Sequence, residues 1–206
     1  KDFVGHVIKQ EGHIDVLINN AGYGAYGVNE TQSLSSIQDM YDVNVFGVIR
    51  MNQHVLPYMR DNKEGRIINV ASLVSHISFP GVSHYASSKH ALRAMTESLR
   101  SEVRPFGIEV VQIEPGAVNT GFEEVALGLI EPTHQDYDSF LKAFKAFIKV
   151  RERARQNFYD EKFAPHSNHQ LQSLISWLES GNPWPGEKEA GNGYMASTVV
   201  SHHNSI

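Results

Sequence analysis

Three short apolar runs, each followed by a segment with helical character, constrain the fold more than any other feature of this sequence. The runs occupy residues 14–20, 66–71 and 108–114, and each has the length of a buried β-strand. Helical segments are expected between them, at about residues 34–62 and 84–103. Strands that alternate with helices pair in parallel, because each helix returns the chain to the same end of the sheet. The sequence therefore predicts an α/β fold.

The segments that flank this pattern are mostly helical. Residues 3–10 have the spacing of the end of an amphipathic helix, and two more amphipathic helices are expected at about residues 137–158 and 171–178. A last strand is expected at residues 194–200. We divide the chain at residue 122 into a first part, 1–122, and a helical part, 123–200, of the same domain, followed by a tail at 201–206.

Charge and composition exclude several classes of function. The 206 residues carry a net charge of −5 with no basic block, which disfavours nucleic acid as a partner. No apolar run reaches the roughly 20 residues that a membrane-spanning helix needs. There is no cysteine, so disulfides, thiolate metal sites and cysteine nucleophiles are excluded. The histidines offer no convincing ligand set, and we expect no metal site.

Ser72, Tyr85 and Lys89 form a constellation with a specific chemistry. Tyr85 and Lys89 are four residues apart near the start of a predicted helix, so both side chains lie on one face. A nearby ammonium lowers the pKa of a phenol and lets it exchange a proton with an alcohol or ketone. Ser72 follows the second predicted strand, at the edge where open α/β sheets bind ligands. Its hydroxyl can share the same substrate oxygen. The alternative is an exposed Tyr–Lys pair without function, because Tyr-x-x-x-Lys is common by chance.

Other motifs in the same order reduce the weight of that alternative. Asn19-Asn20-Ala21-Gly22 ends the first predicted strand, Asn44 lies within the long helix, and Pro115-Gly116 ends the third strand. Over residues 3–122 this order resembles the short-chain dehydrogenase/reductase family, in its single-domain branch. The resemblance implies a Rossmann-like doubly wound parallel sheet, followed by a C-terminal helical substrate-binding region.

The resemblance also implies roles for particular residues. Tyr85 matches the catalytic acid–base, and Lys89 matches the residue that lowers the pKa of that tyrosine. Ser72 matches the residue that orients the substrate oxygen, and Asn44 matches one that holds a water in the proton relay. The implied reaction is hydride transfer between a nicotinamide and a CH–OH or C=O carbon.

The implied cofactor is NAD or NADP, with NADP favoured. The residues that the resemblance places beside it are Asn20, Ala21, Gly22, Tyr85, Lys89, Pro115, Gly116, Val118 and Thr120. The family's glycine-rich loop lies well before its Asn-Asn-Ala-Gly motif, so the fold expected here is incomplete at its N-terminus. Residues 22–27 fit G-x-G-x-x-G, but no helix can start directly after them, and a flexible loop is the preferred interpretation.

Two interpretations follow from the missing first half. In one, the chain is a fragment of a longer oxidoreductase. In the other, it is a truncated, cofactor-deficient interaction or regulatory domain derived from such an enzyme. We favour the first, since the catalytic set is intact. Either way, the first predicted strand has an exposed apolar edge, which predicts poor solubility of the isolated chain.

The expected substrate is a small lipophilic alcohol or ketone. The residues expected to flank its pocket are Ile77, Phe79, Pro80, Val82, Val118 and Phe122, although half of them could be ordinary core. The helix at 137–158 falls where the family has a substrate-binding lid, and the alternative is a helix that only packs on the sheet. We further expect a homo-oligomer through the helices that carry Asn44 and Tyr85, and a cytoplasmic location.

Overall fold

The computed structural model describes residues 2–116, 120–163 and 199–200. The strands are β1 (Val16–Asn19), β2 (Gly65–Val70), β3 (Ile108–Glu114) and β4 (Val199–Val200). The α-helices are α1 (Asp2–Glu11), α2 (Leu34–Tyr41), α3 (Val48–Asn62), α4 (Ser83–Val103), α5 (Phe122–Gly128) and α6 (Asp138–Phe163). A π-helix, η1 (Asp42–Gly47), joins α2 to α3, and short 3₁₀ turns occur at η2 (Leu73–Ser75), η3 (Arg104–Phe106) and η4 (Gln135–Tyr137).

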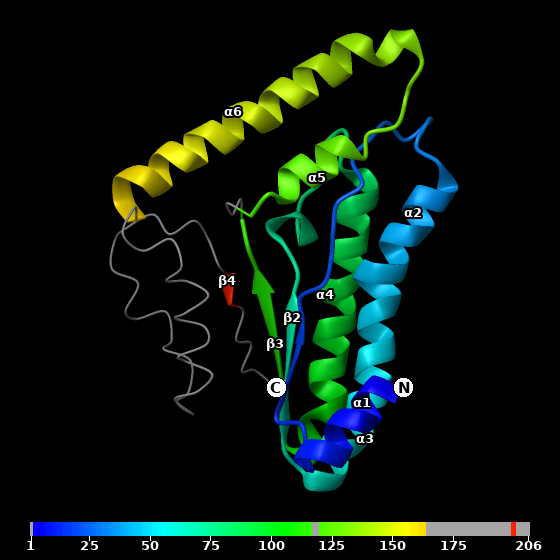
Figure 1. The fold of residues 1–206 in the computed structure, drawn as a ribbon, viewed down its shortest axis with the longest axis vertical. Coiled ribbons are helices and arrows are strands. Elements are labelled where there is room, and N and C mark those ends of the chain that lie inside the picture. The colour runs from blue at the N-terminus through cyan, green and yellow to red at the C-terminus, as the bar shows by residue number, and fades with distance from the viewer. Residues whose placement is uncertain (1, 117–119, 164–198, 201–206) are drawn as a thin grey trace.

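The sheet has the order β1-β2-β3-β4. The first three strands pair in parallel, as the alternation of strands and helices predicts, and β4 pairs with β3 in the antiparallel sense. Because β1, β2 and β3 run the same way, their carboxyl ends meet at one edge of the sheet. In Figure 1 this edge lies beneath α5 and α6.

Helices α3 and α4 cover one face of the sheet (Figure 1). The core on this face is aliphatic: Leu17 of β1, Ile67 of β2 and Val110 of β3 pack with Val55 and Met59 of α3. Burying these side chains stabilises the sheet by about 25 cal/mol per Å² of apolar surface removed from water. A second buried cluster, rich in aromatic rings, lies at the carboxyl edge between α4 and α6.

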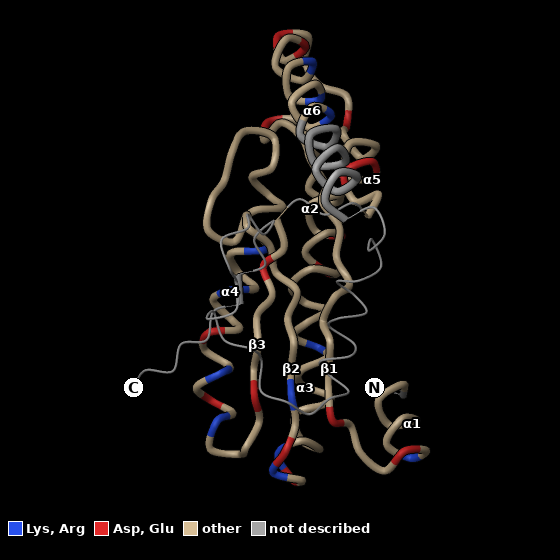
Figure 2. The backbone as a smooth tube through the Cα atoms, turned by 90° about the vertical axis from the view of Figure 1, so that its left-hand side faces the viewer, with Lys and Arg blue, Asp and Glu red and all other residues tan. Residues whose placement is uncertain are grey.

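Strand β1 lies at the edge of the described sheet. Among the described strands it pairs only with β2, and Figure 2 shows the other side of β1 without a neighbouring strand. Val16 and Ile18 on this strand are 36% and 43% exposed. Among the described strands β1 therefore has an unpaired edge, as predicted, and its two exposed apolar side chains lie on one face. An unpaired edge of this kind is a template for association with another chain.

The helix expected at residues 34–62 is interrupted. The structure has α2, then the π-helix η1, then α3. A π-turn inserts one extra residue, which rotates the side chains that follow relative to those before it. Here it turns Asn44 inward, where its side chain bonds to the loop after β1.

Other elements differ from the expectations or lie outside the described residues. The short helix α5 was not anticipated, and α6 runs to Phe163 instead of about residue 158. The helix expected at 171–178, most of the strand expected at 194–200 and the tail at 201–206 lie outside the described residues. No helix in the described part of the chain is both long and apolar enough to cross a membrane.

Candidate active site

Ser72 lies two residues after the end of β2. It is the N-cap of η2, and its Oγ accepts a hydrogen bond from the backbone N–H of Val74 at 3.3 Å. The hydroxyl of Ser75 in turn accepts from the Ser72 backbone N–H at 3.2 Å. This reciprocal capping box fixes the direction of the Ser72 side chain at the carboxyl edge of the sheet.

Tyr85 and Lys89 lie in the first turns of α4, and both are buried. The Lys89 Nζ donates to the carbonyl oxygen of Val70 at 2.9 Å and lies 6.0 Å from the centre of the Tyr85 ring. Burial lowers the pKa of Lys89 from 10.5 to about 8, because desolvation disfavours the charged form. The ammonium therefore persists at neutral pH beside the phenol.

The backbone links Ser72 to this pair. Ser72 stands between Val70, whose carbonyl accepts from Lys89, and Val74, which packs in the same buried cluster as Tyr85. The structure thus bonds Lys89 to the residue two positions before Ser72 and places Tyr85 in the same buried cluster as the residue two positions after it.

Asn44 is fully buried in the π-helix and connects the loop after β1 to α4. Its Oδ1 accepts from the Tyr23 N–H at 3.1 Å, and its Nδ2 donates to the Tyr23 carbonyl at 2.9 Å and to the Ser88 hydroxyl at 3.1 Å. The Ser88 hydroxyl donates to the carbonyl of Tyr85 at 2.7 Å. Asn44 therefore fixes the start of α4 relative to the end of β1.

The residues predicted beside the cofactor are placed as follows. Asn20, Ala21 and Gly22 form an exposed segment after β1, and Gly22 packs against the site. A Cβ added at Gly22 would lie 3.0 Å from Asn44 Oδ1 and 3.5 Å from Lys89 Nζ, so this position suits glycine. Pro115 and Gly116 are half-buried, Thr120 is exposed, and Val118 lies outside the described residues.

The glycine segment at residues 22–27 does not lead into a helix. It continues into an extended loop, and α2 begins only at Leu34. The N-terminus of α2 already holds a carboxylate of the chain itself, since Glu131 accepts from the Ser33 N–H at 2.6 Å and from its hydroxyl at 2.7 Å. These bonds lower the pKa of Glu131. The interpretation of this segment as a loop is consistent with these contacts.

A chain of buried amides, which sequence reasoning missed, supports the strand ends. Asn19 Nδ2 donates to Asn69 Oδ1 at 2.8 Å and to Asn52 Oδ1 at 3.1 Å, and Asn69 Nδ2 donates to Thr96 Oγ1 at 2.8 Å. The chain crosses β1, β2, α3 and α4. The sequence signal for this chain was Asn69, a polar residue inside an apolar run. A buried amide at such a position requires hydrogen-bond partners.

Aromatic rings surround Tyr85. Its ring contacts Phe122 at 5.4 Å and Tyr26 at 6.0 Å between centres, and Tyr26 also contacts Phe144 of α6 at 5.9 Å. Tyr26 is buried, and its hydroxyl donates to the buried carboxylate of Glu123 at 3.1 Å. The side of the site that faces α5 and α6 is thus mostly apolar, with one carboxylate within it.

Of the residues expected to flank a pocket, Phe122 and Val82 contact this cluster, whereas Ile77 is 49% exposed. A cavity of about 450 Å³ lies between α6 and two loops. Its lining residues are Gly27, Val28, Asn29, Pro80, Gly81, Ser83, Tyr137 and Phe140.

The donor set fits the nicotinamide-ribose half of a dinucleotide. A lysine ammonium has three N–H donors, and the Val70 carbonyl takes one of those of Lys89. The remaining donors can bond ribose hydroxyls at the carboxyl edge of the sheet. Within residues 2–116, 120–163 and 199–200, no group of three His, Cys, Asp or Glu side chains could hold a metal ion.

The sequence matches a family model described as short chain dehydrogenase over residues 1–126. This chain belongs to the short-chain dehydrogenase family. Among curated relatives, this short-chain dehydrogenase is 39% identical over 152 residues to 3-ketodihydrosphingosine reductase of Bacteroides thetaiotaomicron, covering 73% of this chain and 56% of the relative. The chain therefore spans about half the length of that relative.

Solved structures agree with this assignment. A short-chain dehydrogenase from Streptomyces avermitilis matches with a TM-score of 0.61 and 27% identity, over 86% of this chain and 72% of that one. A gluconate 5-dehydrogenase from Burkholderia cenocepacia, in complex with NADP and tartrate, matches with a TM-score of 0.58 and 27% identity, over 59% of this chain and 48% of that one.

Proposed function

We propose that the intact protein transfers a hydride between NAD(P)(H) and a CH–OH or C=O carbon. The observation that carries this proposal is the buried Lys89 ammonium, which bonds the backbone beside Ser72 and lies on the same helix face as Tyr85. Such a group favours the phenolate and so allows Tyr85 to act as an acid or a base near neutral pH.

When bound, the reduced nicotinamide supplies the hydride that converts the carbonyl carbon into a carbinol carbon. The residues of the chain handle the proton and the position of the substrate. The Ser72 hydroxyl donates to the carbonyl oxygen and orients it. Tyr85 then releases its hydroxyl proton to that oxygen as the carbon–oxygen double bond becomes single. The Lys89 ammonium stabilises the phenolate that remains, and Asn44 keeps the start of α4 in place.

We propose a lipophilic alcohol or ketone as the substrate. The aromatic rings around Tyr85 support this, as does the position of α6, whose Phe144 and Phe140 stack at 5.9 Å. An apolar enclosure favours an apolar ligand by about 25 cal/mol per Å² buried. The similar protein of Bacteroides thetaiotaomicron is named as a reductase of 3-ketodihydrosphingosine, a lipophilic ketone, and this supports the same substrate class.

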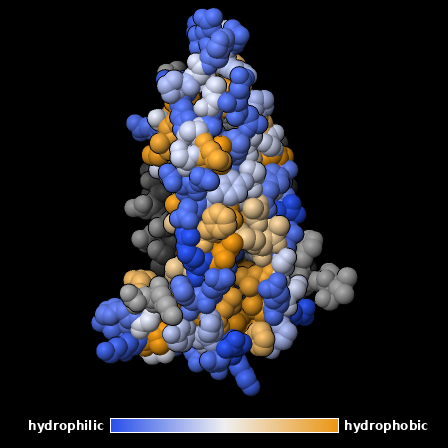
Figure 3. Space-filling model, turned by 90° about the vertical axis from the view of Figure 1, so that its right-hand side faces the viewer, coloured by the Kyte–Doolittle hydropathy of each residue, from blue (hydrophilic) through white to orange (hydrophobic). Residues whose placement is uncertain are grey.

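We further propose NADP as the preferred cofactor, a homo-oligomeric state and a cytoplasmic location, with the helical part beginning at residue 123. Figure 3 shows apolar side chains gathered on the lower half of the face on which α2, η1 and α3 lie in Figure 1. Phe46 in η1 is 50% exposed and Tyr58 in α3 is 38% exposed. Exposed apolar residues on one face support a contact between copies through this side.

The test uses the intact protein with NADPH and NADH carrying deuterium at the transferred position. The probes are 3-ketodihydrosphingosine, a steroid ketone and, as a polar control, gluconate with NADP⁺. Mass spectrometry of the products should find deuterium on the carbinol carbon of a lipophilic probe. Absence of cofactor binding, measured as an unchanged NAD(P)H fluorescence on titration, would instead favour a non-catalytic domain. Turnover of gluconate alone would overturn the proposed substrate class.

A further inference from the structure

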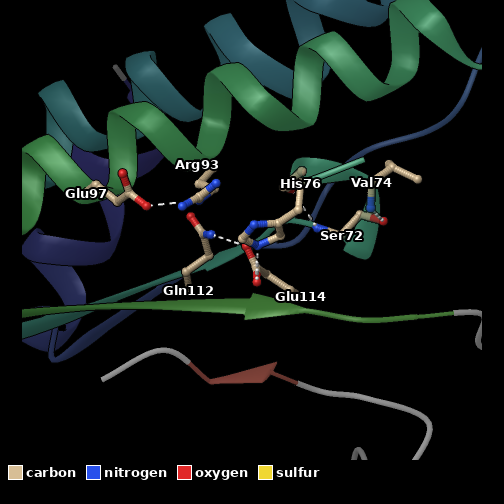
Figure 4. Close-up of polar contacts among 8 residues, drawn as sticks. Ser72, Val74, His76, Arg93, Glu97, Gln112 and Glu114 are labelled. Atoms are coloured by element: carbon tan, nitrogen blue, oxygen red, sulfur yellow. Dashed lines mark hydrogen bonds and ion pairs between the residues drawn. The ribbon is translucent and has the colours of Figure 1, made fainter. Parts of the chain in front are cut away.

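A buried carboxylate at the end of β3 has no place in the proton relay above. Glu114 is 3% exposed, and its side chain lies on the side of the sheet that faces α4 (Figure 4). Its Oε1 accepts from Gln112 Nε2 at 2.5 Å, and its Oε2 lies 2.7 Å from His76 Nε2. Arg93 of α4, drawn in the same view, forms its ion pair with Glu97 at 2.9 Å.

His76 lies at the far end of the turn that begins with Ser72. It is the C-cap of η2, and its backbone N–H donates to the Leu73 carbonyl at 3.2 Å. The turn is so short that its two caps, Ser72 and His76, are four positions apart, with only the three residues of η2 between them. A displacement of His76 therefore also displaces Ser72.

The contacts of this turn with β3 are arranged around both of its ends. At the Ser72 end, backbone hydrogen bonds to β3 continue past the end of β2. The Ala71 N–H donates to the Ile113 carbonyl at 2.7 Å, and the Leu73 N–H donates to the Pro115 carbonyl at 3.0 Å. At the His76 end, the hydrogen bond between the side chains of His76 and Glu114 joins the turn to β3.

Burying a carboxylate costs free energy unless it is hydrogen-bonded, so Glu114 requires its two donors. The His76 side chain is 40% exposed and that of Glu114 is 3% exposed. Removing His76 takes away the donor that links Glu114 to the turn, and a water molecule in its place bonds the carboxylate without holding the turn against β3. Both segments carry the site: the turn carries Ser72, and the strand end leads into Pro115.

We propose that Glu114 and His76 are positioning residues for Ser72: their hydrogen bond holds the η2 turn against β3, and the capping box of that turn directs the Ser72 hydroxyl. The proposal rests on the proposed function, in which Ser72 orients the substrate oxygen. The hydrogen bond between His76 and Glu114 acts through Ser72, so its loss lowers turnover only while the Ser72 hydroxyl is present.

The test measures turnover of the intact protein with NADPH and 3-ketodihydrosphingosine for His76→Leu, in the parent and in a Ser72→Ala background. We expect His76→Leu to lower kcat about tenfold in the parent, since small misplacements of reacting groups have effects of this order or more. In the Ser72→Ala background the same substitution should have little further effect. His76→Gln, which keeps a donor for Glu114, should retain most of the parent's kcat.

One control variant and two further outcomes separate the possible failures. His13→Leu removes a histidine from an exposed ion pair with Asp15 and should leave kcat unchanged. Equal losses from His76→Leu in both backgrounds would assign the pair a structural role only and would overturn the inference, while leaving the proposed function intact. If Ser72→Ala itself left kcat unchanged, the role of Ser72 in the proposed function would fail, and the positioning role with it.

Discussion

Replacing Lys89 with methionine removes a buried charge while keeping a side chain of similar length. Burial places the pKa of Lys89 at about 8 in the folded protein, against 10.5 when it is exposed. The difference of roughly 2.5 pH units corresponds to about 3 kcal/mol, at about 1.4 kcal/mol for each unit. Lys89 is 5% exposed, so solvent screening does little to reduce this value.

The sign follows from proton binding. Below about pH 8 both the folded and the unfolded protein hold the proton on Lys89, and the folded state carries the full cost of the buried charge. Between about pH 8 and 10.5 the unfolded state holds more protons, so the free energy of unfolding rises with pH in this window. Lys89→Met lacks this contribution and should be relatively most stable near neutral pH.

The assay is urea unfolding of the intact apo protein and of Lys89→Met at several pH values. The stability of the parent relative to the variant should rise by about 3 kcal/mol as the pH passes from about 8 to 10.5. Lys9→Met, at an exposed position of α1, controls for removing a lysine from a helix. A difference between parent and Lys89→Met that stays constant across this window would refute the reasoning.

Two other substitutions test the surroundings of the site. Gly22→Ala places a Cβ 3.0 Å from Asn44 Oδ1. It should lower turnover about tenfold and lower the free energy of unfolding, measured in urea, by about 1–2 kcal/mol. The control Gly5→Ala has open space around its Cβ and should leave the free energy of unfolding unchanged or raise it. Thr96→Val leaves the buried Asn69 amide without its acceptor, and calorimetry should find the free energy of unfolding lower by about 1–3 kcal/mol. An unchanged melting temperature would argue that the chain of amides does not stabilise the strand ends.

The sequence was sufficient to predict the elements that neighbouring residues determine. Strand β3 begins and ends where the apolar run does, and the four-residue spacing of Tyr85 and Lys89 placed both on one face of α4. The order of the motifs along the chain was sufficient for the family. These features depend on periodicity and spacing, which one sequence contains.

Features that depend on distant contacts were not predictable in this way. The π-turn places Asn44 where its side chain bonds to Tyr23, and nothing in the helical periodicity of residues 34–62 indicates where the extra residue falls. The bond between His76 and Glu114 joins residues that the chain separates by a whole helix, so neither residue gave a local signal.

The central claim is that Tyr85 transfers the proton while Lys89 and the cofactor site remain independent of its hydroxyl. The most direct measurement is Tyr85→Phe in the intact protein, with NAD(P)H binding followed by fluorescence and turnover followed by deuterium transfer to the lipophilic ketone. We expect cofactor affinity within about twofold of the parent and turnover reduced by at least about a hundredfold, the usual share of a general acid. Turnover equal to that of the parent would contradict the account.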